Sequence, residues 1–339
     1  MKTDLASIII VNWNGVTLLQ DCLHSVFSQS YLDIEVILVD NNSSDNSVEF
    51  VAKNHPAVKL IQLETNRGFS DGNIEGLKYT NGQYIVLLNT DARLSSTWLH
   101  YMVLALKSND KIGLCASKLI IDNTQFIDSI GDCFTTAFNV IRPGEHDNES
   151  YYFSKRYVSG ACAAAVIYKK QMLDEIGFLD ADFYLNHEDT DLNMRAWFAG
   201  WKCMFVPEAV AYHKVSASIG RLSDTSVYFS SRNCEWVWLK NIPLGLMIRY
   251  LPQRVLYELC SCAFFCLLSG KWRPYLKGKW DAIRGVPMIL VKRRELSQFR
   301  KLAAYEIKKE LFPLVPYLRR QLLRSGKVDP FSRDKNKDN

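Results

Sequence analysis

The sequence predicts an α/β protein with an open, mainly parallel sheet covered by helices on both faces, followed by a basic helical region. Short β-rich apolar runs alternate with longer amphipathic segments over the first 120 residues, which is typical of parallel strands joined by helices. Charge is divided between the two regions: residues 1–239 carry a net charge of −9, whereas residues 240–339 hold 22 Lys and Arg against 8 Asp and Glu, a net charge of +14. At 339 residues and 48% hydrophobic side chains, the chain is long enough for a substantial core.

Four apolar runs rich in β-branched residues are expected to form buried parallel strands. They are residues 7–11, 34–39, 58–61 and 84–88. Helical patterns separate them, at residues 16–29, 44–54 and 72–78. Further elements are expected as a small-residue strand over 158–166, a helix over 170–176, a helix starting near residue 190 and a strand over 202–206.

All four of these strands lead into polar segments, most of which contain Asn or Asp. The segments are residues 12–15, 40–45, 64–69 and 89–91. Ligands of open α/β sheets bind beyond the carboxyl ends of the strands, so these segments are candidate ligand contacts. The sequence contains neither GxGxxG after its first strand nor a P-loop, which weighs against an NAD enzyme and a P-loop NTPase.

Three side chains are candidates for binding a nucleotide diphosphate. Asp91 directly follows an apolar strand, where a carboxylate can hold a Mg²⁺ ion bridged to phosphate, although Asn-x-Asp can also simply close a turn. Asp40 ends the second strand, ahead of Ser43 or Ser44 as cap of the next helix, and its carboxylate could accept hydrogen bonds from a base or ribose. His213 could supply a second metal ligand, but a lone histidine is more often an ordinary packed or surface residue.

The segment FYLNHEDTDL, residues 183–192, places three carboxylates and an imidazole between apolar residues. Carboxylates are favoured at the start of a helix, which accounts for Asp191 and its i,i+4 partner Arg195. That preference does not account for every acid in the cluster, so one of them is a candidate catalytic base.

Residues 241–330 are expected to form a helical, basic, membrane-associating region, and residues 331–339 a disordered tail. The apolar segment 244–268 is interrupted by Arg249, Arg254 and Glu258. Burying each charge near a bilayer centre costs about 2.5–3.5 kcal/mol, so an arrangement in the interface is favoured over a full span.

Basic residues interleaved with Trp and Tyr follow this apolar segment, over residues 271–294. Such a mixture suits an anionic membrane surface, where each basic group contributes about 1 kcal/mol. A solvated helical face or a contact with another subunit remains the alternative. Nucleic acid is not expected as a partner because no recognised binding motif is present.

The nine cysteines include no CxxC pair, and the N-terminal apolar run is too short for a signal peptide or a membrane span. This composition fits a reducing compartment. The expected location is the cytoplasm, with the protein peripheral on the cytoplasmic face of the inner membrane.

The sequence resembles the inverting glycosyltransferases of family 2, which have the GT-A fold, and within them the rhamnosyltransferase-like branch. The resemblance covers roughly residues 5–240, the expected catalytic domain. It rests on seven segments in order: SIIIVNWNG, ILVDNNSSD, NRGFSDGN, LLNTDA, VSGACAAAV, GFLDADFYLNHEDTDLNMR and YHKVSASIG.

The resemblance implies a donor-binding half over about residues 1–115 and an acceptor and base half over about 116–240. Asn89-Thr90-Asp91 matches the Asp-x-Asp element, with Asn89 in place of the first Asp; this lowers the negative charge of the site. His213 matches the histidine that holds Mg²⁺ or Mn²⁺ together with Asp91, and Asp189 matches the general base. The implied donor-binding residues are Asn12, Asp40, Asn66, Gly68, Asn73, Asn89 and Asp91, and the implied acceptor or sugar contacts are Gly160 and Glu188.

The implied activity is transfer of a single sugar, with dTDP-L-rhamnose as the expected donor and a UDP-linked sugar as the other option. The expected acceptor is a saccharide on polyprenyl diphosphate, in the assembly of O-antigen, other lipopolysaccharide or capsule. The Gln-x-x-Arg-Trp element of processive relatives is absent from the sequence, which favours single addition. Three alternatives remain: a metal-dependent nucleotidyltransferase, a non-catalytic nucleotide-sugar-binding protein of the same fold, and a membrane-associated scaffold.

Overall fold

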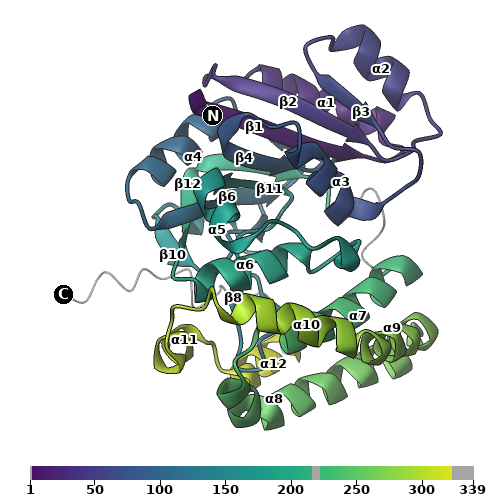
Figure 1. The fold of residues 1–339 in the computed structure, drawn as a ribbon, viewed down its shortest axis with the longest axis vertical. Coiled ribbons are helices and arrows are strands. Elements are labelled where there is room, and N and C mark those ends of the chain that lie inside the picture. Colours follow the sequence, from purple (N-terminus) through teal and green to yellow (C-terminus); the bar gives the residue numbers. More distant parts are fainter. Residues whose placement is uncertain (1, 216–221, 323–339) are drawn as a thin grey trace.

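A ten-stranded mixed sheet forms the centre of the protein in the computed structural model, which describes residues 2–215 and 222–322 (Figure 1). The strand order is β10-β12-β6-β11-β4-β1-β2-β3, with β5 beside β12 and β7 beside β6. The four predicted parallel strands are confirmed as β1 (Lys2–Asn12), β2 (Ile34–Asp40), β3 (Lys59–Gln62) and β4 (Gly82–Leu88).

Three helices connect these strands as the amphipathic patterns predicted, and a fourth, which comes after the last of them, was not predicted. They are α1 (Val16–Phe27), α2 (Ser47–Asn54), α3 (Gly68–Leu77) and α4 (Trp98–Lys107). The prediction that Ser43 or Ser44 caps α2 is wrong, because that helix begins at Ser47 with Asn46 in the N-cap position. The Ser43 hydroxyl instead donates a hydrogen bond to Asp40, within the loop between strand and helix.

The second half of the sheet contains short and antiparallel strands. These are β5 (Ala92–Leu94), β6 (Ile112–Ile121), β7 (Ile127–Ser129), β10 (Arg156–Val158), β11 (Ala165–Lys169) and β12 (Lys202–His213), with β8 (Cys133–Phe134) and β9 (Val140–Ile141) in a separate pair. The helices here are α5 (Lys170–Ile176), α6 (Glu188–Phe198) and the short 3₁₀ turns η1 (Glu149–Tyr151) and η2 (Ala181–Phe183).

The predicted continuous strand over 158–166 is wrong, since β10 ends at Val158 and β11 begins at Ala165. The intervening residues bond to three different segments. Ser159 N donates to the Asp132 carbonyl, Ala163 N to the Asp189 carboxylate, and the Ala164 carbonyl accepts from Asn89 N. These bonds replace a regular strand ladder, and only an isolated bridge between Gly160 and Asp132 remains.

Strand β12 extends well beyond the predicted 202–206 and includes His213 as its last residue. It pairs in parallel with β6 and antiparallel with β5, where His213 lies opposite Ala92. Because Asp91 directly precedes Ala92, this register brings the histidine to the end of β4.

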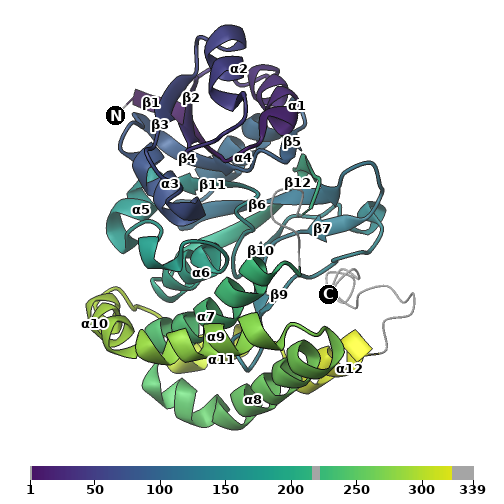
Figure 2. The same ribbon diagram turned by 90° about the vertical axis from the view of Figure 1, so that its right-hand side faces the viewer.

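The C-terminal region is helical, as predicted. Its elements are α7 (Asp224–Asn241), α8 (Leu244–Ala263), the π-helix η3 (Phe264–Leu268), α9 (Trp272–Arg284), α10 (Val286–Ser297), α11 (Ala304–Glu310) and α12 (Leu314–Leu322). The helices lie below α6, on the side away from β1, β2 and β3 (Figures 1 and 2). The last part of the predicted helical region and the predicted disordered tail lie outside the described residues.

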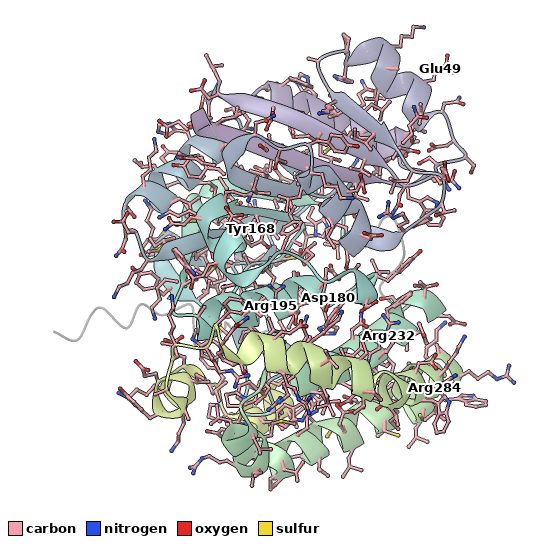
Figure 3. All side chains as sticks on the ribbon, viewed as in Figure 1. Glu49, Tyr168, Asp180, Arg195, Arg232 and Arg284 are labelled. Carbon is pink, nitrogen blue, oxygen red and sulfur yellow. The ribbon has the colours of Figure 1, made fainter. Side chains whose placement is uncertain are left out.

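A buried network of charges joins these helices to α6. Asp191 accepts hydrogen bonds from Arg195 Nε (2.9 Å), Lys240 Nζ (3.0 Å) and Asn241 Nδ2 (2.8 Å), which confirms the predicted Asp191–Arg195 pair. Burial alone would raise the pKa of Asp191, but Lys240 and Arg195 lower it to about 2. Lys240 also pairs at 2.6 Å with Asp180, which lies near Arg195 in Figure 3. Helix α6 is therefore held rigidly against α7.

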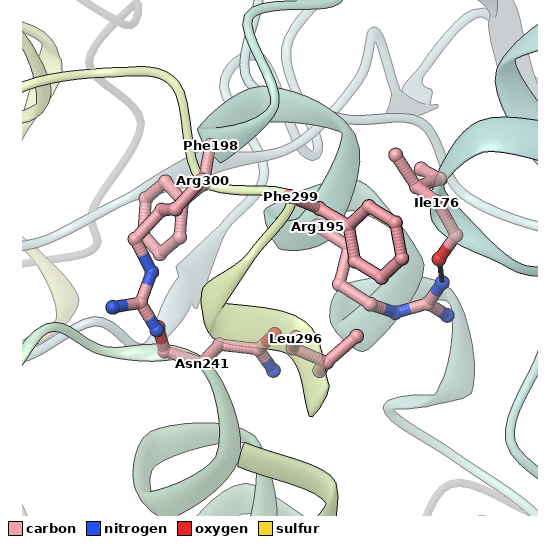
Figure 4. Close-up of a pocket in the computed structure, with 7 residues that line it drawn as sticks. All are labelled: Ile176, Arg195, Phe198, Asn241, Leu296, Phe299 and Arg300. Atoms are coloured by element: carbon pink, nitrogen blue, oxygen red, sulfur yellow. Dashed lines mark hydrogen bonds between the residues drawn. The ribbon is translucent and has the colours of Figure 1, made fainter. Parts of the chain in front are cut away.

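A small pocket beside this network is lined by Arg195, Asn241 and Arg300 (Figure 4). Its volume is about 10 Å³, roughly room for one water molecule. Arg300 Nη2 donates to the Asn241 carbonyl at 3.0 Å, so the pocket belongs to the joint between α7 and the chain after α10.

Candidate active site

The ends of β1 and β2 form the first wall of the site, where Asn12 and Asp40 lie opposite each other. Asn12 Nδ2 donates to Asp40 Oδ1 (3.0 Å) and Ser43 Oγ (3.1 Å), and Asp40 Oδ2 accepts from Ser43 N (2.9 Å). The Asp40 carboxylate is thus less free than predicted, because both oxygens already fix the loop. Asn12 Oδ1 is buried without a hydrogen-bond partner among the described residues and could accept from a ligand. Contacts of both residues with a base or ribose stay predictions.

The loop before α3 joins this wall to the segment that precedes α6. Gly68 has φ +79°, which favours glycine; its N–H donates to Asn66 Oδ1 (2.9 Å) and its carbonyl accepts from Asn41 Nδ2 (2.9 Å). Asn66 Oδ1 also accepts from the Tyr184 hydroxyl at 3.2 Å. Asn73 is buried and donates to a carbonyl one turn earlier in α3, so its contact with a donor stays a prediction.

Asp91, His213 and Asp128 form a buried row at the end of β4. His213 Nδ1 is 2.8 Å from Asp128 Oδ2, and His213 Nε2 is 3.3 Å from Asp91 Oδ1. Burial of the ring lowers the pKa of His213, but the hydrogen bond with Asp128 and the nearby Asp91 carboxylate raise it to about 9. Asp128 therefore orients the imidazole so that Nε2 faces Asp91.

Asp91 and His213 fit two ligands of a divalent cation. Asn89 Oδ1 is buried with no hydrogen-bond partner among residues 2–215 and 222–322, and the contact of Asp91 Oδ1 with His213 Nε2 is long, at 3.3 Å, so both oxygens keep acceptor capacity. The same residues contain no cluster of three or more His, Cys, Asp or Glu placed to hold a metal. A Mg²⁺ or Mn²⁺ ion would complete its shell with diphosphate oxygens and water, the usual environment of Mg²⁺ in proteins.

Two further residues of this site, Asp132 and Arg142, were not predicted. Arg142 Nη1 is 3.7 Å from Asp128 Oδ1, and Arg142 Nε is 3.8 Å from Asp132 Oδ1. Burial raises the pKa of Asp132 to about 7; Arg142 opposes this rise, and the charges of Asp189 and Asp128 add to it. Arg142 is thus linked to His213 through Asp128, and Asp132 and Arg142 both interact electrostatically with Asp189. They belong to segments with very short strands and no sequence periodicity, and no motif marked them.

Asp189 is the second residue of α6 and is partly exposed. Its Oδ1 accepts from Thr190 N (2.7 Å), and its Oδ2 accepts from Ala163 N (3.2 Å). Two backbone donors fix the carboxylate, and Oδ2 keeps a lone pair for a further donor. The side chain can therefore accept a proton from a correctly placed hydroxyl.

The segment before Asp189 has an uncommon backbone conformation. Tyr184, Asn186 and His187 all have positive φ, between 63° and 67°. Asn233 Nδ2, on α7, lies within 2.9 Å of the carbonyls of Phe183, Leu185 and Asn186. Non-glycine residues in this region cost of order 1–3 kcal/mol each and persist where the surroundings hold them, often at functional sites.

Gly160 lies against Asn193. A Cβ atom there would lie 2.4 Å from Asn193 Cγ, so the missing side chain makes room for Asn193, and the contact of Gly160 with a sugar stays a prediction. Asn193 Nδ2 in turn donates to the Ala161 carbonyl at 2.9 Å. Glu188 is buried with no hydrogen-bond partner for Oε2 among the described residues; burial, then the Asp189 charge, raise its pKa to about 8. A neutral Glu188 can donate a hydrogen bond, so its contact with a sugar stays a prediction.

A family model described as "Glycosyl transferase family 2" matches residues 7–177, just over half of the chain. The match covers β1 to α5 and therefore includes the first wall of the site and Asp91.

Curated relatives include the poly-beta-1,6-N-acetyl-D-glucosamine synthase of Staphylococcus epidermidis, 27% identical over 278 residues, or 78% of this chain and 66% of the relative. The synthase of the same name from Staphylococcus aureus is 22% identical and matches 63% of this chain and 51% of its own length. The chain thus spans about half to two thirds of the curated relatives it matches.

Solved structures share the fold at low identity. Residues 1–349 of S. aureus TarS superimpose with a TM-score of 0.54 at 16% identity, covering 93% of this chain and 91% of that one. GalNAc-T7, solved with UDP, GalNAc and Mn²⁺, gives 0.56 at 19% identity and covers 70% of this chain and 48% of that one. The mannosyltransferase PcManGT from Pyrobaculum calidifontis, solved with GDP-Man and Mn²⁺, gives 0.51 at 15% identity and covers 96% and 89%. The fold is GT-A, as predicted.

Proposed function

The chain belongs to glycosyl transferase family 2, and on that premise we propose that it transfers a single sugar from a nucleotide-sugar donor to a saccharide acceptor, with inversion. One observation carries the proposal: Arg142 contacts both Asp132 and Asp128, the partner of His213, and Asp132 and Arg142 interact electrostatically with Asp189. A leaving-group site and a base site on the two sides of one centre are what a single displacement at a sugar carbon requires.

Asp189 is the general base in this proposal. Its Oδ2 takes the proton of the acceptor hydroxyl, while the acceptor oxygen forms the new bond to the anomeric carbon. The bond from that carbon to the diphosphate oxygen breaks in the same step, on the opposite face of the sugar. The backbone donors from Ala163 and Thr190 keep the carboxylate directed during the step.

Asp91 and His213 would hold a divalent cation on the side of the site where the nucleoside diphosphate departs. The ion supplies positive charge to the diphosphate oxygens when it is bound. Asp128 keeps His213 Nε2 directed toward this site, and Asn89 Oδ1 offers a further polar contact. In this proposal the nucleotide contacts the remaining donor-binding residues, Asn12, Asp40, Asn66, Gly68 and Asn73.

For the substrates, we propose L-rhamnose from dTDP-L-rhamnose as donor sugar and a saccharide on polyprenyl diphosphate as acceptor, in cell-surface polysaccharide assembly. The resemblance of LLNTDA to the rhamnosyltransferase-like branch, with Asn89 in place of the first Asp, supports this donor. The curated relatives named as poly-N-acetylglucosamine synthases make UDP-N-acetylglucosamine the second donor to test. GDP-mannose, present in one solved neighbour, is the third.

A panel of nucleotide sugars tests the proposal. Binding of each donor is measured by calorimetry with Mn²⁺ or Mg²⁺ and with EDTA, and transfer is measured with lipid-linked saccharides. We expect one donor to bind in a metal-dependent way and its sugar to appear on an acceptor. Failure of every nucleotide sugar to bind or react would overturn the function, and binding without transfer would favour the nucleotide-sugar-binding alternative.

A further inference from the structure

Helices α8 and α9, joined by η3, form a helical hairpin with a long exposed apolar stripe. We call residues 244–284 the hairpin. Its exposed large apolar side chains recur every three or four residues along each helix, which places them on one face of that helix. The stripe consists of Leu244, Ile248, Leu251, Val255 and Leu259 on α8, Leu267 and Leu268 at the end of η3, and Trp272, Leu276, Trp280 and Ile283 on α9, and Leu256 and Phe264 are exposed as well.

A partly buried cluster of charges lies where α8 packs against α7 and α9. Arg254 pairs with Glu235 on α7 and with Glu258 on α8, both at 2.8 Å, and Lys279 on α9 contacts the same two carboxylates. Burial would raise the pKa of Glu235, but Arg254 and Lys279 lower it to about 2. These ion pairs hold α7, α8 and α9 together. Helix α8 is therefore charged where it packs against the protein and apolar where it is exposed.

The ion pairs of this cluster limit the ways in which the hairpin can bind a membrane. Leu244–Leu268 is long and apolar enough to cross a bilayer by length and composition, and little of it is buried in the protein. Crossing would require α8 to leave α7 and α9 and to carry Arg254 into hydrocarbon without Glu235 and Lys279. Burying these charges in hydrocarbon is unfavourable even though Arg254 would keep Glu258 as a partner, whereas lying in the interface keeps every ion pair intact.

Basic side chains border the apolar stripe. Arg249 on α8 and Arg273, Lys277 and Arg284 on α9 are exposed, and Arg284 stands out at the edge of the molecule in Figure 3. Both views place α8 at the end of the molecule opposite α2, where the catalytic domain does not cover it (Figures 1 and 2). An apolar stripe bordered by cations complements a bilayer with anionic headgroups.

We propose that the hairpin binds an anionic lipid surface, with α8 and α9 in the plane of the interface and Leu267 and Leu268 inserted below the headgroups. These two side chains are 80% and 79% exposed, as expected for residues that insert. This proposal rests on the proposed function and extends it, because a lipid-bound hairpin would bring the active site to an acceptor carried on a lipid. A second copy of the chain on the same stripe is the competing occupant.

Vesicle co-sedimentation of the full chain tests this surface, using phosphatidylcholine vesicles with and without phosphatidylglycerol and no donor or acceptor. We expect binding that is stronger with phosphatidylglycerol and weakens with salt. Replacing Leu267→Glu and Leu268→Glu together should lower vesicle partitioning at least about tenfold. The matched control is Leu32→Glu, at an apolar residue that is 86% exposed in the donor half, and it should bind as the unmodified chain does.

A second pair of substitutions separates charge from apolar contact. Arg273→Glu with Lys277→Glu should abolish the preference for phosphatidylglycerol, whereas Lys111→Glu on the catalytic domain should not. Three results would overturn the proposal. The first is vesicle binding of the leucine variant equal to that of the unmodified chain, and the second is retention in the membrane after alkaline carbonate extraction. The third is a dimer, seen in light scattering, that the leucine variant abolishes. Vesicle binding by a chain that transfers no sugar would refute the proposed function alone.

Discussion

The donor half and the acceptor half of the catalytic domain position their polar side chains in different ways. In the donor half, Asn12, Asp40 and Ser43 are each within three residues of the end of a strand and bond to one another across neighbouring strands. In the acceptor half, Asp128 and Asp189 come from a short hairpin and from the start of a helix, far apart in the sequence. Parallel strand ends bring donor residues together through sheet geometry alone, whereas the acceptor side depends on tertiary contacts.

Substitutions in the donor loops and at Asp189 should have separate effects. The donor loops are fixed by hydrogen bonds that do not involve Asp189, and Asp189 is held by Ala163 and Thr190, outside those loops. Substitutions in the donor loops should therefore alter donor binding, whereas substitutions of Asp189 should alter turnover.

The largest expected effect is on turnover, from Asp189→Asn. The amide has the shape of the carboxylate but cannot take the acceptor proton, so kcat should fall by about 10²–10⁴. Donor affinity, measured by calorimetry, should stay within about twofold. Asp174→Asn, an exposed helical carboxylate paired with Lys170, is the matched control and should keep full activity. Equal loss of donor binding and turnover would show that the halves are not separate.

A smaller effect is expected from Asp128→Asn, because Asp128 acts through His213. Loss of the carboxylate that orients a metal-binding histidine typically weakens metal affinity about 10–100-fold. Titration with Mn²⁺, followed by electron paramagnetic resonance, measures this loss without substrate. Asp122→Asn serves as control, since Asp122 lies just after β6 and accepts from Arg93. Unchanged Mn²⁺ affinity in the Asp128 variant would remove Asp128 from the site.

Metal affinity should also increase as the pH rises. The pKa of His213 is about 9 in the metal-free protein, so at lower pH the ring carries a proton that it must lose to bind metal. Affinity should rise about tenfold per pH unit up to about pH 9 and then level off. Calorimetry in buffers of different ionisation enthalpy should detect about one proton released per ion near neutral pH. No proton release would contradict histidine ligation.

The smallest expected effect is in the donor half, from Ser43→Ala. Ser43 bonds to Asp40 and Asn12, so its loss should lower the free energy of unfolding by about 0.5–1.5 kcal/mol and weaken donor binding slightly. Urea denaturation measures the first, and calorimetry the second. Ser44→Ala removes an exposed hydroxyl with one long contact and should change neither. Equal effects of the two variants would contradict the role of Ser43 in the loop.

The sequence predicted those parts of the fold and site that depend on local patterns. The strand before Asp91 is a continuous apolar run, and the helix that carries Asp189 begins with an acidic cluster, so both positions could be read directly. The small-residue stretch 158–166 was misread as one strand because its small side chains also suit a loop packed under Asn193. Asp128 and Arg142 were missed because strands of two or three residues show no periodicity.

The stereochemistry of the product tests the central claim most directly. A single displacement, with Asp189 on the acceptor hydroxyl and the diphosphate leaving near Asp91 and His213, must invert the anomeric carbon. Nuclear magnetic resonance of the product, through the one-bond carbon–hydrogen coupling at the transferred anomeric centre, reports its configuration. The account predicts the configuration opposite to that of the donor, and retention would contradict it.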